Sequence, residues 1–263
     1  MYTIDLSGKT ALVFGVANKN SLAWSIASGL SRAGARLALA YQGERLRDRV
    51  GSLASDLGPE TLLLECDVTR DEQVESACRG AGEAFGSIDF LVHSVAFARK
   101  EDLEGAFLDT SREGFRLALE ISAYSLIAVA KAAAPWMESK DGRSGGSILT
   151  LTYMASQRVV PSYNVMGSAK AALEHAVRQL AFELGPKGIR VNALSAGPVN
   201  TLSARGISGF LDMLHKTAEK APLRRNIEPE EVASAGLFLL SGMGSGVTGE
   251  VLYVDAGYNI MGT

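Results

Sequence analysis

Residues 10–41 read TALVFGVANKNSLAWSIASGLSRAGARLALAY, and this stretch decides the fold class. It begins with an apolar run at Thr10–Phe14, continues through an amphipathic segment at Leu22–Ala33 and ends in a second apolar run at Arg36–Tyr41. Continuous apolar runs are typical of parallel strands that helices cover on both faces. Because Gly34 follows the amphipathic segment, as glycine often follows a helix end, we expect a strand, a helix and a strand here.

The same alternation continues along the rest of the sequence. Further apolar runs predict strands at Thr61–Cys66, Ile88–Val95, Ser147–Leu151, Ile189–Leu194 and Val251–Val254. Helices are predicted at Glu44–Leu57 and Asp71–Phe85, which end at Gly58 and Gly86 with left-handed caps, and a further helix is predicted to start at Pro229. We therefore expect one domain over residues 1–263, an α/β fold with a Rossmann-like, doubly wound parallel sheet of about seven strands and helices on both faces.

The stretch 201–225 interrupts this alternation. It has a weak helical pattern, three glycine or proline residues and five basic residues. It follows the sixth predicted strand, on the side where α/β sheets bind ligands. Since loops this long inside compact domains are usually functional, we interpret it as a substrate-binding lid of one or two short helices, with an ordinary surface excursion as the alternative.

Composition excludes several classes of protein. With 26 basic and 29 acidic residues the net charge is −3, so we expect no nucleic-acid partner. The longest apolar stretch, Ile121–Met137, contains Lys131 and Pro135, and the N-terminal residues do not resemble a signal peptide. We therefore expect a cytoplasmic protein with no membrane-spanning helix. Cys66 and Cys78 fit buried thiols in a reducing compartment, and three scattered histidines predict no metal site.

The turns after the predicted strands hold residues that fit a dinucleotide. After the first strand, Gly15, Ala17 and Ser21 would let a diphosphate approach the N-terminus of a helix. Only one glycine of the Gly-x-Gly-x-x-Gly pattern is present, so this turn alone fits a structural turn equally well. After the second strand, Gln42 offers no charge to a ribose phosphate, which favours NADH over NADPH, although two nearby arginines leave NADPH open.

Polar or small residues also follow the third and fourth predicted strands. Asp67 could accept a hydrogen bond from an adenine amino group or could cap the next helix. Ser94 and Ala96 are small enough for a flat ring or a ribose to pack on their backbone. His93 is expected to be a core histidine, and the other two histidines are expected to be solvated.

Tyr163 and Lys170 form the strongest local constellation. Seven residues make almost two helical turns, so the two side chains would share a helix face about 10.5 Å apart along the axis, which fits a ligand spanned between them. Lys170 could bind ribose hydroxyls and lower the pKa of Tyr163. The phenol could then donate a hydrogen bond or a proton to a substrate oxygen. Taken alone, the pair also fits a helix with one aromatic and one charged surface residue.

Together these segments resemble the NADH-dependent enoyl-acyl-carrier-protein reductase branch of the short-chain dehydrogenase/reductase family. The resemblance runs from about Leu6 to Gly257. It rests on GVANKNSLAW at 15–24, Tyr41-Gln42, CDV at 66–68, HSVAFA at 93–98, YNVMGSAKAALE at 163–174 and RVNALSAGPVNTL at 190–202.

Four features separate this branch from ordinary members of the family. Ordinary members carry Thr-Gly-x-x-x-Gly-x-Gly at the first turn, Asn-Asn-Ala-Gly after the fourth strand and Tyr-x-x-x-Lys in the active site. Here the turn has one glycine, the fourth strand is followed by Ser-Val-Ala, and Met166 stands four residues before Lys170. The usual Pro-Gly after the sixth strand is reversed to Gly197-Pro198. Phe14 and Ala96 also depart from the commonest form, in which threonine and glycine stand there.

The resemblance implies reduction of trans-2-enoyl thioesters in bacterial type II fatty acid synthesis, with NADH as cofactor, acyl carrier protein as partner and a homotetrameric assembly. The implied catalytic residues are Tyr153, Tyr163 and Lys170. The implied cofactor-binding residues are Gly15, Ala17, Ser21, Leu22, Gln42, Asp67, Val68, Ser94, Ala96, Lys170, Val199 and Thr201. The implied substrate-binding residues are Ala98, Tyr153, Tyr163, Leu202, Ile207 and Phe210, with Met213 and Leu214 also lining the acyl chain. A basic rim for the carrier protein is implied at Arg205, Lys216, Lys220, Arg224 and Arg225.

Two other functions stay open at this point. A carbonyl-reducing dehydrogenase on the same fold would require Tyr-x-x-x-Lys, which is missing. A non-catalytic nucleotide sensor would predict loss of Tyr163 or Lys170, and both residues are present. Fold alone does not decide between these functions.

Overall fold

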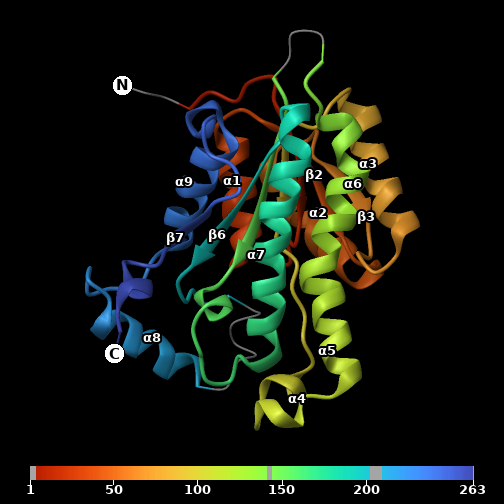
Figure 1. Ribbon diagram of the computed structural model, residues 1–263. Coiled ribbons are helices and arrows are strands. Elements are labelled where there is room, and N and C mark those ends of the chain that lie inside the picture. Colours follow the sequence, from red (N-terminus) through yellow and green to blue (C-terminus); the bar gives the residue numbers. More distant parts are fainter. Residues whose placement is uncertain (1–3, 141–143, 202–208, 263) are drawn as a thin grey trace.

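Seven parallel strands form one sheet in the computed structural model, which describes residues 4–140, 144–201 and 209–262 (Figure 1). The strand order is β3-β2-β1-β4-β5-β6-β7, so the chain builds one half outward from β1 and then crosses to build the other half. The strands are β1 (Thr10–Phe14), β2 (Arg36–Tyr41), β3 (Leu62–Glu65), β4 (Phe90–His93), β5 (Ser147–Thr152), β6 (Arg190–Ala196) and β7 (Val251–Val254).

Helices connect the strands. The longer ones are α1 (Leu22–Arg32), α2 (Glu44–Leu57), α3 (Asp71–Phe85), α5 (Arg112–Leu119), α6 (Ser125–Met137), α7 (Asn164–Leu184), α8 (Phe210–Lys220) and α9 (Pro229–Leu240). A π-helical turn, η2 (Glu120–Tyr124), joins α5 to α6. The short helices are α4 (Lys100–Leu103), η1 (Phe107–Asp109), η3 (Met154–Ser156), η4 (Gly185–Lys187), η6 (Gly242–Gly244) and η7 (Tyr258–Ile260).

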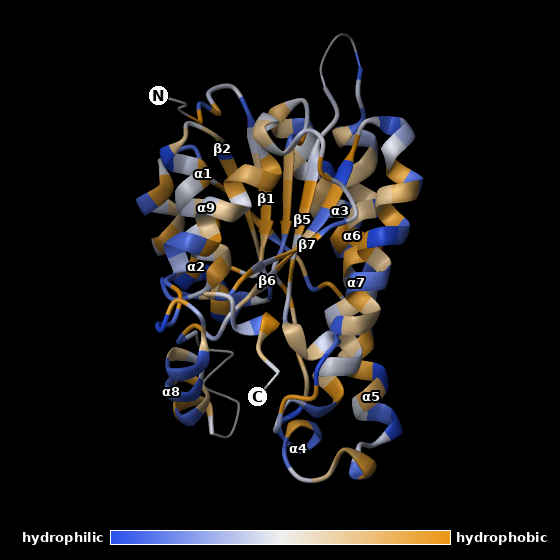
Figure 2. Cartoon of the chain, turned by 60° about the vertical axis from the view of Figure 1, so that its left-hand side comes forward, coloured by the Kyte–Doolittle hydropathy of each residue, from blue (hydrophilic) through white to orange (hydrophobic). Residues whose placement is uncertain are grey.

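Each face of the sheet carries its own hydrophobic core. In the central strand β1, Ala11 and Val13 face the core shared with α1, α2 and α9, whereas Leu12 and Phe14 face the core shared with α3, α6 and α7. All five residues of β1 are buried. Figure 2 shows the apolar strands between two layers of helices that carry both hydrophilic and hydrophobic residues. Burial on both faces explains why the strands appear in the sequence as continuous apolar runs, and it confirms the predicted doubly wound fold.

Strand and helix boundaries differ from the predictions by a few residues. The fourth strand is shorter than the predicted Ile88–Val95, because Ile88 donates its N–H to the Trp136 carbonyl and the chain turns out of the sheet after His93. Gly86 ends α3 in the predicted left-handed conformation, with φ 80° and ψ −19°. The expectation for Gly58 was wrong in its details: its φ of 133° is positive, but its ψ of 151° lies outside the left-handed helical region, so α2 does not end in a left-handed cap.

The helical segment 112–137 is both long and apolar. By length and composition it is apolar enough to cross a membrane, so Lys131 and Pro135 do not exclude a span by that test. Half of its most apolar window is buried inside the chain, and α6 packs against α3, α7 and β4. This packing is what a core helix of a doubly wound domain shows.

The fold indicates where a ligand would bind. The strands are parallel, so their carboxyl ends share one edge of the sheet. Beyond that edge α4 lies on one side and α8 on the other (Figure 1). Ligands of open α/β sheets bind in the crevice outside this edge, where the strand order reverses.

Candidate active site

A cleft of about 570 Å³ opens at the carboxyl ends of β1, β4, β5 and β6, and residues of α4 and α8 also line it. It brings together most of the residues that sequence reasoning singled out. Those lining the cleft are Gly15, Ala17, Ser21, Leu22, Ser94, Ala96, Ala98, Tyr153, Tyr163, Lys170, Val199, Thr201 and Phe210, with Met213 of the predicted lid.

The cleft also has walls that sequence reasoning missed. These are Asn18, Val95, Phe97, Lys100, Leu103, Leu151, Thr152, Met166, Ala196, Gly197 and Pro198. Most of them adjoin predicted site residues in the same turns, so position after a strand end was the signal that could have found them. Lys100 and Leu103 belong to the four-residue helix α4, whose sequence gave no such signal.

The turn between β1 and α1 packs closely against the backbone that follows β4. Gly15 has a φ of 99°, and a Cβ on it would lie 2.0 Å from the carbonyl oxygen of Ser94. Ser21 is the N-cap of α1, since its Oγ accepts a hydrogen bond from Trp24 N at 3.3 Å. The free N–H groups of this helix start favour an anionic ligand. This cradle and its small residues fit the diphosphate of a dinucleotide.

Gln42, Asp67 and Val68 lie in the turns after β2 and β3, outside the cleft's lining. Gln42 Nε2 donates to Asp67 Oδ2 at 3.0 Å, so the two predicted adenosine ligands contact each other. Partial burial acts to raise the pKa of Asp67, but hydrogen bonds from Thr69 and Gln42 hold that pKa below its usual value. Asp67 does not cap α3, whose N-cap is Arg70; its carboxylate closes the turn on Thr69 instead.

Tyr153, Tyr163 and Lys170 meet inside the cleft. Tyr153 directly follows β5, Tyr163 directly precedes α7, and their ring centroids are 5.1 Å apart. Tyr153 Oη donates to Met213 Sδ at 3.5 Å, which ties the pair to α8. Lys170 Nζ donates to the Leu151 carbonyl at 2.7 Å. Tyr163 therefore lies at the start of the helix on which Lys170 stands two turns later, much as the spacing predicts.

The electrostatics of these groups correct one expectation. Burial lowers the pKa of Lys170 to about 8. Burial, with Tyr258 and Asp255 nearby, raises the pKa of Tyr153 to about 12. Burial also raises the pKa of Tyr163, with a further contribution from Tyr153. The pKa of Tyr163 is therefore raised and not lowered as predicted, because burial removes the water that would stabilise the charged phenolate. Tyr163 is a neutral phenol that can donate a hydrogen bond.

The backbone around Tyr163 is unusual. Ser162 and Asn164, its neighbours in sequence, have φ values of 60° and 33°, which non-glycine residues rarely adopt. Asn164 Nδ2 donates to the Gly105 carbonyl at 3.2 Å. Such conformations concentrate at functional sites, where the surrounding structure holds them in place.

The predicted lid is described in part. Leu202, Ile207 and Arg205 lie outside the described residues. Helix α8 carries Phe210, which is buried and lines the cleft with Met213. Leu214 does not line the cleft as expected, because the turn of α8 directs it into a neighbouring cavity.

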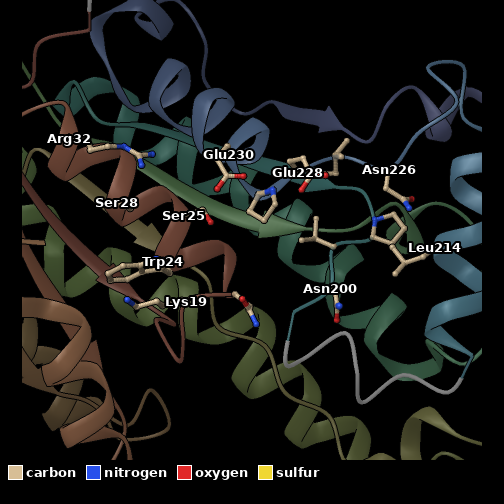
Figure 3. Close-up of a pocket in the computed structure, with 15 residues that line it drawn as sticks. Lys19, Trp24, Ser25, Ser28, Arg32, Asn200, Leu214, Asn226, Glu228 and Glu230 are labelled. Atoms are coloured by element: carbon tan, nitrogen blue, oxygen red, sulfur yellow. The ribbon is translucent and has the colours of Figure 1, made fainter. Parts of the chain in front are cut away.

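That neighbouring cavity, of about 520 Å³, lies between α1, residues 198–200 and the start of α9 (Figure 3). It shares Pro198 and Val199 with the cleft. Its polar lining mixes cations such as Arg32 with anions such as Glu228 and Glu230, and neither Tyr163 nor Lys170 contributes to it. The chemistry therefore belongs to the first cleft.

The histidines and cysteines take the structural places predicted for them. His93 is fully buried; its ring nitrogens pair with Thr150 Oγ1 at 3.0 Å and Ser125 Oγ at 2.8 Å. His175 and His215 are exposed, and both cysteines are buried and free. Within residues 4–140, 144–201 and 209–262, no cluster of three metal-ligating side chains occurs.

Comparisons with known proteins point to one family. A family model described as enoyl-(acyl carrier protein) reductase matches residues 15–259. The chain is 51% identical to the enoyl-acyl-carrier-protein reductase (NADH) FabI of Bacillus cereus, over 98% of this chain and 99% of the relative. It is 50% identical to the protein of the same name in Bacillus subtilis, over 97% and 98% of the two chains.

Solved structures agree. The Bacillus cereus enoyl-acyl carrier protein reductase with NADP+ and indole naphthyridinone matches with a TM-score of 0.95 and 50% identity, over all of both chains. The enoyl-acyl-carrier-protein reductase of Anaplasma phagocytophilum in complex with NAD matches with a TM-score of 0.92 and 44% identity, over 100% of this chain and 96% of that one.

Proposed function

Because this chain belongs to the enoyl-(acyl carrier protein) reductase family, we propose that its cleft reduces trans-2-enoyl thioesters of acyl carrier protein with NADH. The observation that carries the proposal is the meeting of Tyr163 and Lys170 in the cleft that also contains the Gly15–Ser21 turn. One end of this cleft fits a diphosphate, and the other is lined by both a neutral phenol and a buried ammonium group. That is the set of groups a hydride transfer to a conjugated thioester requires.

Different residues of the cleft and of the adjoining turns bind different parts of the cofactor. The Gly15 turn and the start of α1 hold the diphosphate, and Gln42, Asp67 and Val68 hold the adenosine. Lys170 would hold the ribose on the nicotinamide side, and Ser94, Ala96, Val199 and Thr201 would hold the nicotinamide ring. NADH, when bound, supplies the hydride that the β-carbon of the enoyl group accepts.

Tyr163 supports the electron flow. As the β-carbon gains the hydride, negative charge develops on the thioester oxygen, and the Tyr163 phenol donates a hydrogen bond to it. Such a donor is worth more inside a dry cleft than in water, because nothing else solvates the charge there. The α-carbon would then take up a proton from solvent, which completes the saturated acyl thioester. Tyr153 lines the same cleft. Ala98 and Phe210 lie along the acyl chain, and residues 201–225 act as the lid.

One assay tests this function. Purified protein receives NADH or NADPH with either a trans-2-enoyl thioester or a 3-oxoacyl thioester, and the loss of reduced-nicotinamide absorbance is followed. We expect NADH oxidation with the enoyl substrate alone. Oxidation with the 3-oxoacyl substrate would support a carbonyl reductase instead. Cofactor binding with no oxidation in either case would support a nucleotide sensor.

The basic side chains of α8 fit an acidic carrier protein. Lys216 and Lys220 are exposed, whereas Arg225 is engaged by Glu231 at 2.7 Å and Arg224 donates to the Glu219 carbonyl. Lys216→Glu should therefore raise KM for a carrier-protein thioester and leave KM for a small thioester unchanged. Equal KM values for the carrier-protein thioester in the variant and the wild type would place the docking surface elsewhere.

Self-association is expected along α5, η2, α6 and α7. An apolar groove there is lined by Leu119, Tyr124, Ile127 and the small residues Ala172 and Ala176. Tyr124 and Ile127 are 51% and 40% exposed in the single chain, which a second copy would cover. Light scattering of the purified protein should give a tetramer for the wild type and a smaller species for Ile127→Glu, and we expect the tetramer to be the form present in the cytoplasm. A monomeric wild type would contradict this assembly.

A further inference from the structure

Glu174 is a buried carboxylate to which the roles above assign nothing. It lies on α7 one turn after Lys170, and only 3% of the residue is exposed. Its Oε1 atom accepts two hydroxyl hydrogen bonds, one from Thr152 Oγ1 at 2.8 Å and one from Ser156 Oγ at 2.6 Å. A carboxylate is almost never this deeply buried unless its neighbours compensate for the lost water.

The two hydroxyl donors bracket Tyr153. Thr152 is the last residue of β5 and Ser156 is the last residue of η3, so a single oxygen atom on α7 holds both ends of the turn that carries Tyr153. Tyr163 directly precedes the same helix. The relative position of the two phenol rings therefore depends on the distance that Glu174 fixes between this turn and α7.

The charge of Glu174 acts on Lys170. Four residues along a helix correspond to about 6 Å of rise, and the carboxylate raises the pKa of Lys170 against the lowering effect of burial. The other titratable groups around this site are His93 from β4, Tyr153, Tyr163 and Tyr253 from β7, and Asp255 acts on Tyr153 and Tyr253. Burial lowers the pKa of His93 to about 3 and raises the pKa of Tyr153 and Tyr163, so these three are neutral between pH 6 and 9. Glu174 is the carboxylate whose charge acts on Lys170.

We propose that Glu174 is a positioning residue for the cleft: it anchors the turn that carries Tyr153 to α7, and it places a carboxylate one helical turn from Lys170, whose ammonium group binds the ribose of NADH. This rests on the proposed function only for the identity of the cofactor and the reaction. The carboxylate touches neither substrate nor cofactor, and it acts through Thr152, Ser156 and Lys170.

The first test separates the charge from the hydrogen bonds. Glu174→Gln keeps an oxygen that accepts from both hydroxyls but removes the negative charge. Dissociation constants of NADH are measured by fluorescence from pH 6 to 9.5. NADH binding by the wild type should weaken above about pH 8, whereas the midpoint of the variant should fall by roughly one pH unit. That shift gives about fivefold weaker binding at pH 8 and nearly equal binding at pH 6. Coincident pH profiles would overturn the proposal.

The second test removes an anchor and keeps the charge, and it does not depend on whether Glu174→Gln folds. Ser156→Ala should leave the dissociation constant of NADH and its pH midpoint unchanged, and it should lower kcat with an enoyl thioester by about tenfold. A purely structural role would lower only the melting temperature, so an unchanged kcat would contradict the anchoring. NADH binding needs no enoyl substrate, so the first test does not depend on the reaction. A wild type that bound NADH without reducing the thioester would contradict the proposed function but not the role of Glu174.

Discussion

The rings of Tyr153 and Tyr163 lie with their centroids 5.1 Å apart and their planes inclined by 57°. Tilted aromatic pairs at this distance are favourable, so the contact fixes the turn after β5 against the start of α7. Burial raises the pKa of both phenols, which therefore remain protonated at physiological pH. Two neutral hydroxyl groups thus share one cleft, and the question is which of them stabilises the developing charge.

We expect Tyr163→Phe to lower kcat by roughly tenfold to a thousandfold, because it removes a hydrogen bond that is strongest in the transition state. The ring contact with Tyr153 is kept, so the fold and the dissociation constant of NADH should not change. Steady-state kinetics with an enoyl thioester, together with NADH fluorescence, would check both statements. Wild-type turnover in Tyr163→Phe would remove this residue from the proposed mechanism.

Tyr153→Phe is the matched control. Its hydroxyl donates to Met213 Sδ in this structure, so its loss should loosen the contact with α8. We expect a higher KM for the enoyl substrate and a smaller loss of kcat than in Tyr163→Phe. A greater loss of kcat in Tyr153→Phe would exchange the roles of the two tyrosines.

Much of this site follows from the sequence because parallel strands end at one edge. Once the apolar runs are recognised as strands, Gly15, Ser94, Tyr153 and Val199 must gather there, although they are far apart in the chain. The Tyr163 and Lys170 pair follows from helical spacing in the same way. These residues all line the observed cleft.

What the sequence does not predict depends on tertiary packing. The rotation of α8 decides that Met213 faces the cleft and Leu214 the neighbouring cavity, and a short amphipathic pattern does not determine this rotation. Glu174 has the sequence context of a solvated helix residue, yet α7 packs it against β5 and η3. The pKa of Tyr163 depends on how completely the neighbours exclude water, which no spacing rule contains.

Gly15→Ala should disrupt cofactor binding. The residue has a φ of 99°, which costs roughly 1–2 kcal/mol for an alanine, and its Cβ would also lie 2.0 Å from the Ser94 carbonyl oxygen. The backbone must shift, so we expect at least a tenfold loss of NADH affinity. Gly86→Ala is the control, because it has a φ of 80° with nothing within 4 Å of the new Cβ. It should lose stability by about 1 kcal/mol and bind NADH normally. Equal NADH affinities in the two variants would contradict diphosphate binding at the Gly15 turn.

Cofactor choice should respond to charge at position 42. Gln42 is exposed after β2 and donates to Asp67, so a new side chain there has room. Gln42→Arg would place a cation where a ribose 2′-phosphate lies, and the ratio of kcat/KM for NADPH over NADH should rise by about tenfold or more. Gln42→Glu should lower the same ratio. If neither substitution changed it, the adenosine would lie elsewhere.

His93 should make the fold sensitive to acid. Burial lowers its pKa from 6.5 to about 3, so the unfolded chain binds a proton between these values and the folded chain does not. Stability from this group is full above pH 6.5 and is lost as the pH falls, by roughly 1.4 kcal/mol per pH unit. Denaturant unfolding at pH 7, 6 and 5 and fixed protein concentration would measure it. Carboxylates with a lowered pKa, such as Asp67 and Glu231, also stabilise the fold. Their contribution is lost only below about pH 4.5, outside the range of pH 5 to 7 that is measured. His93→Gln should flatten the slope between pH 6.5 and 5, and an unchanged slope would show that another group accounts for the acid sensitivity.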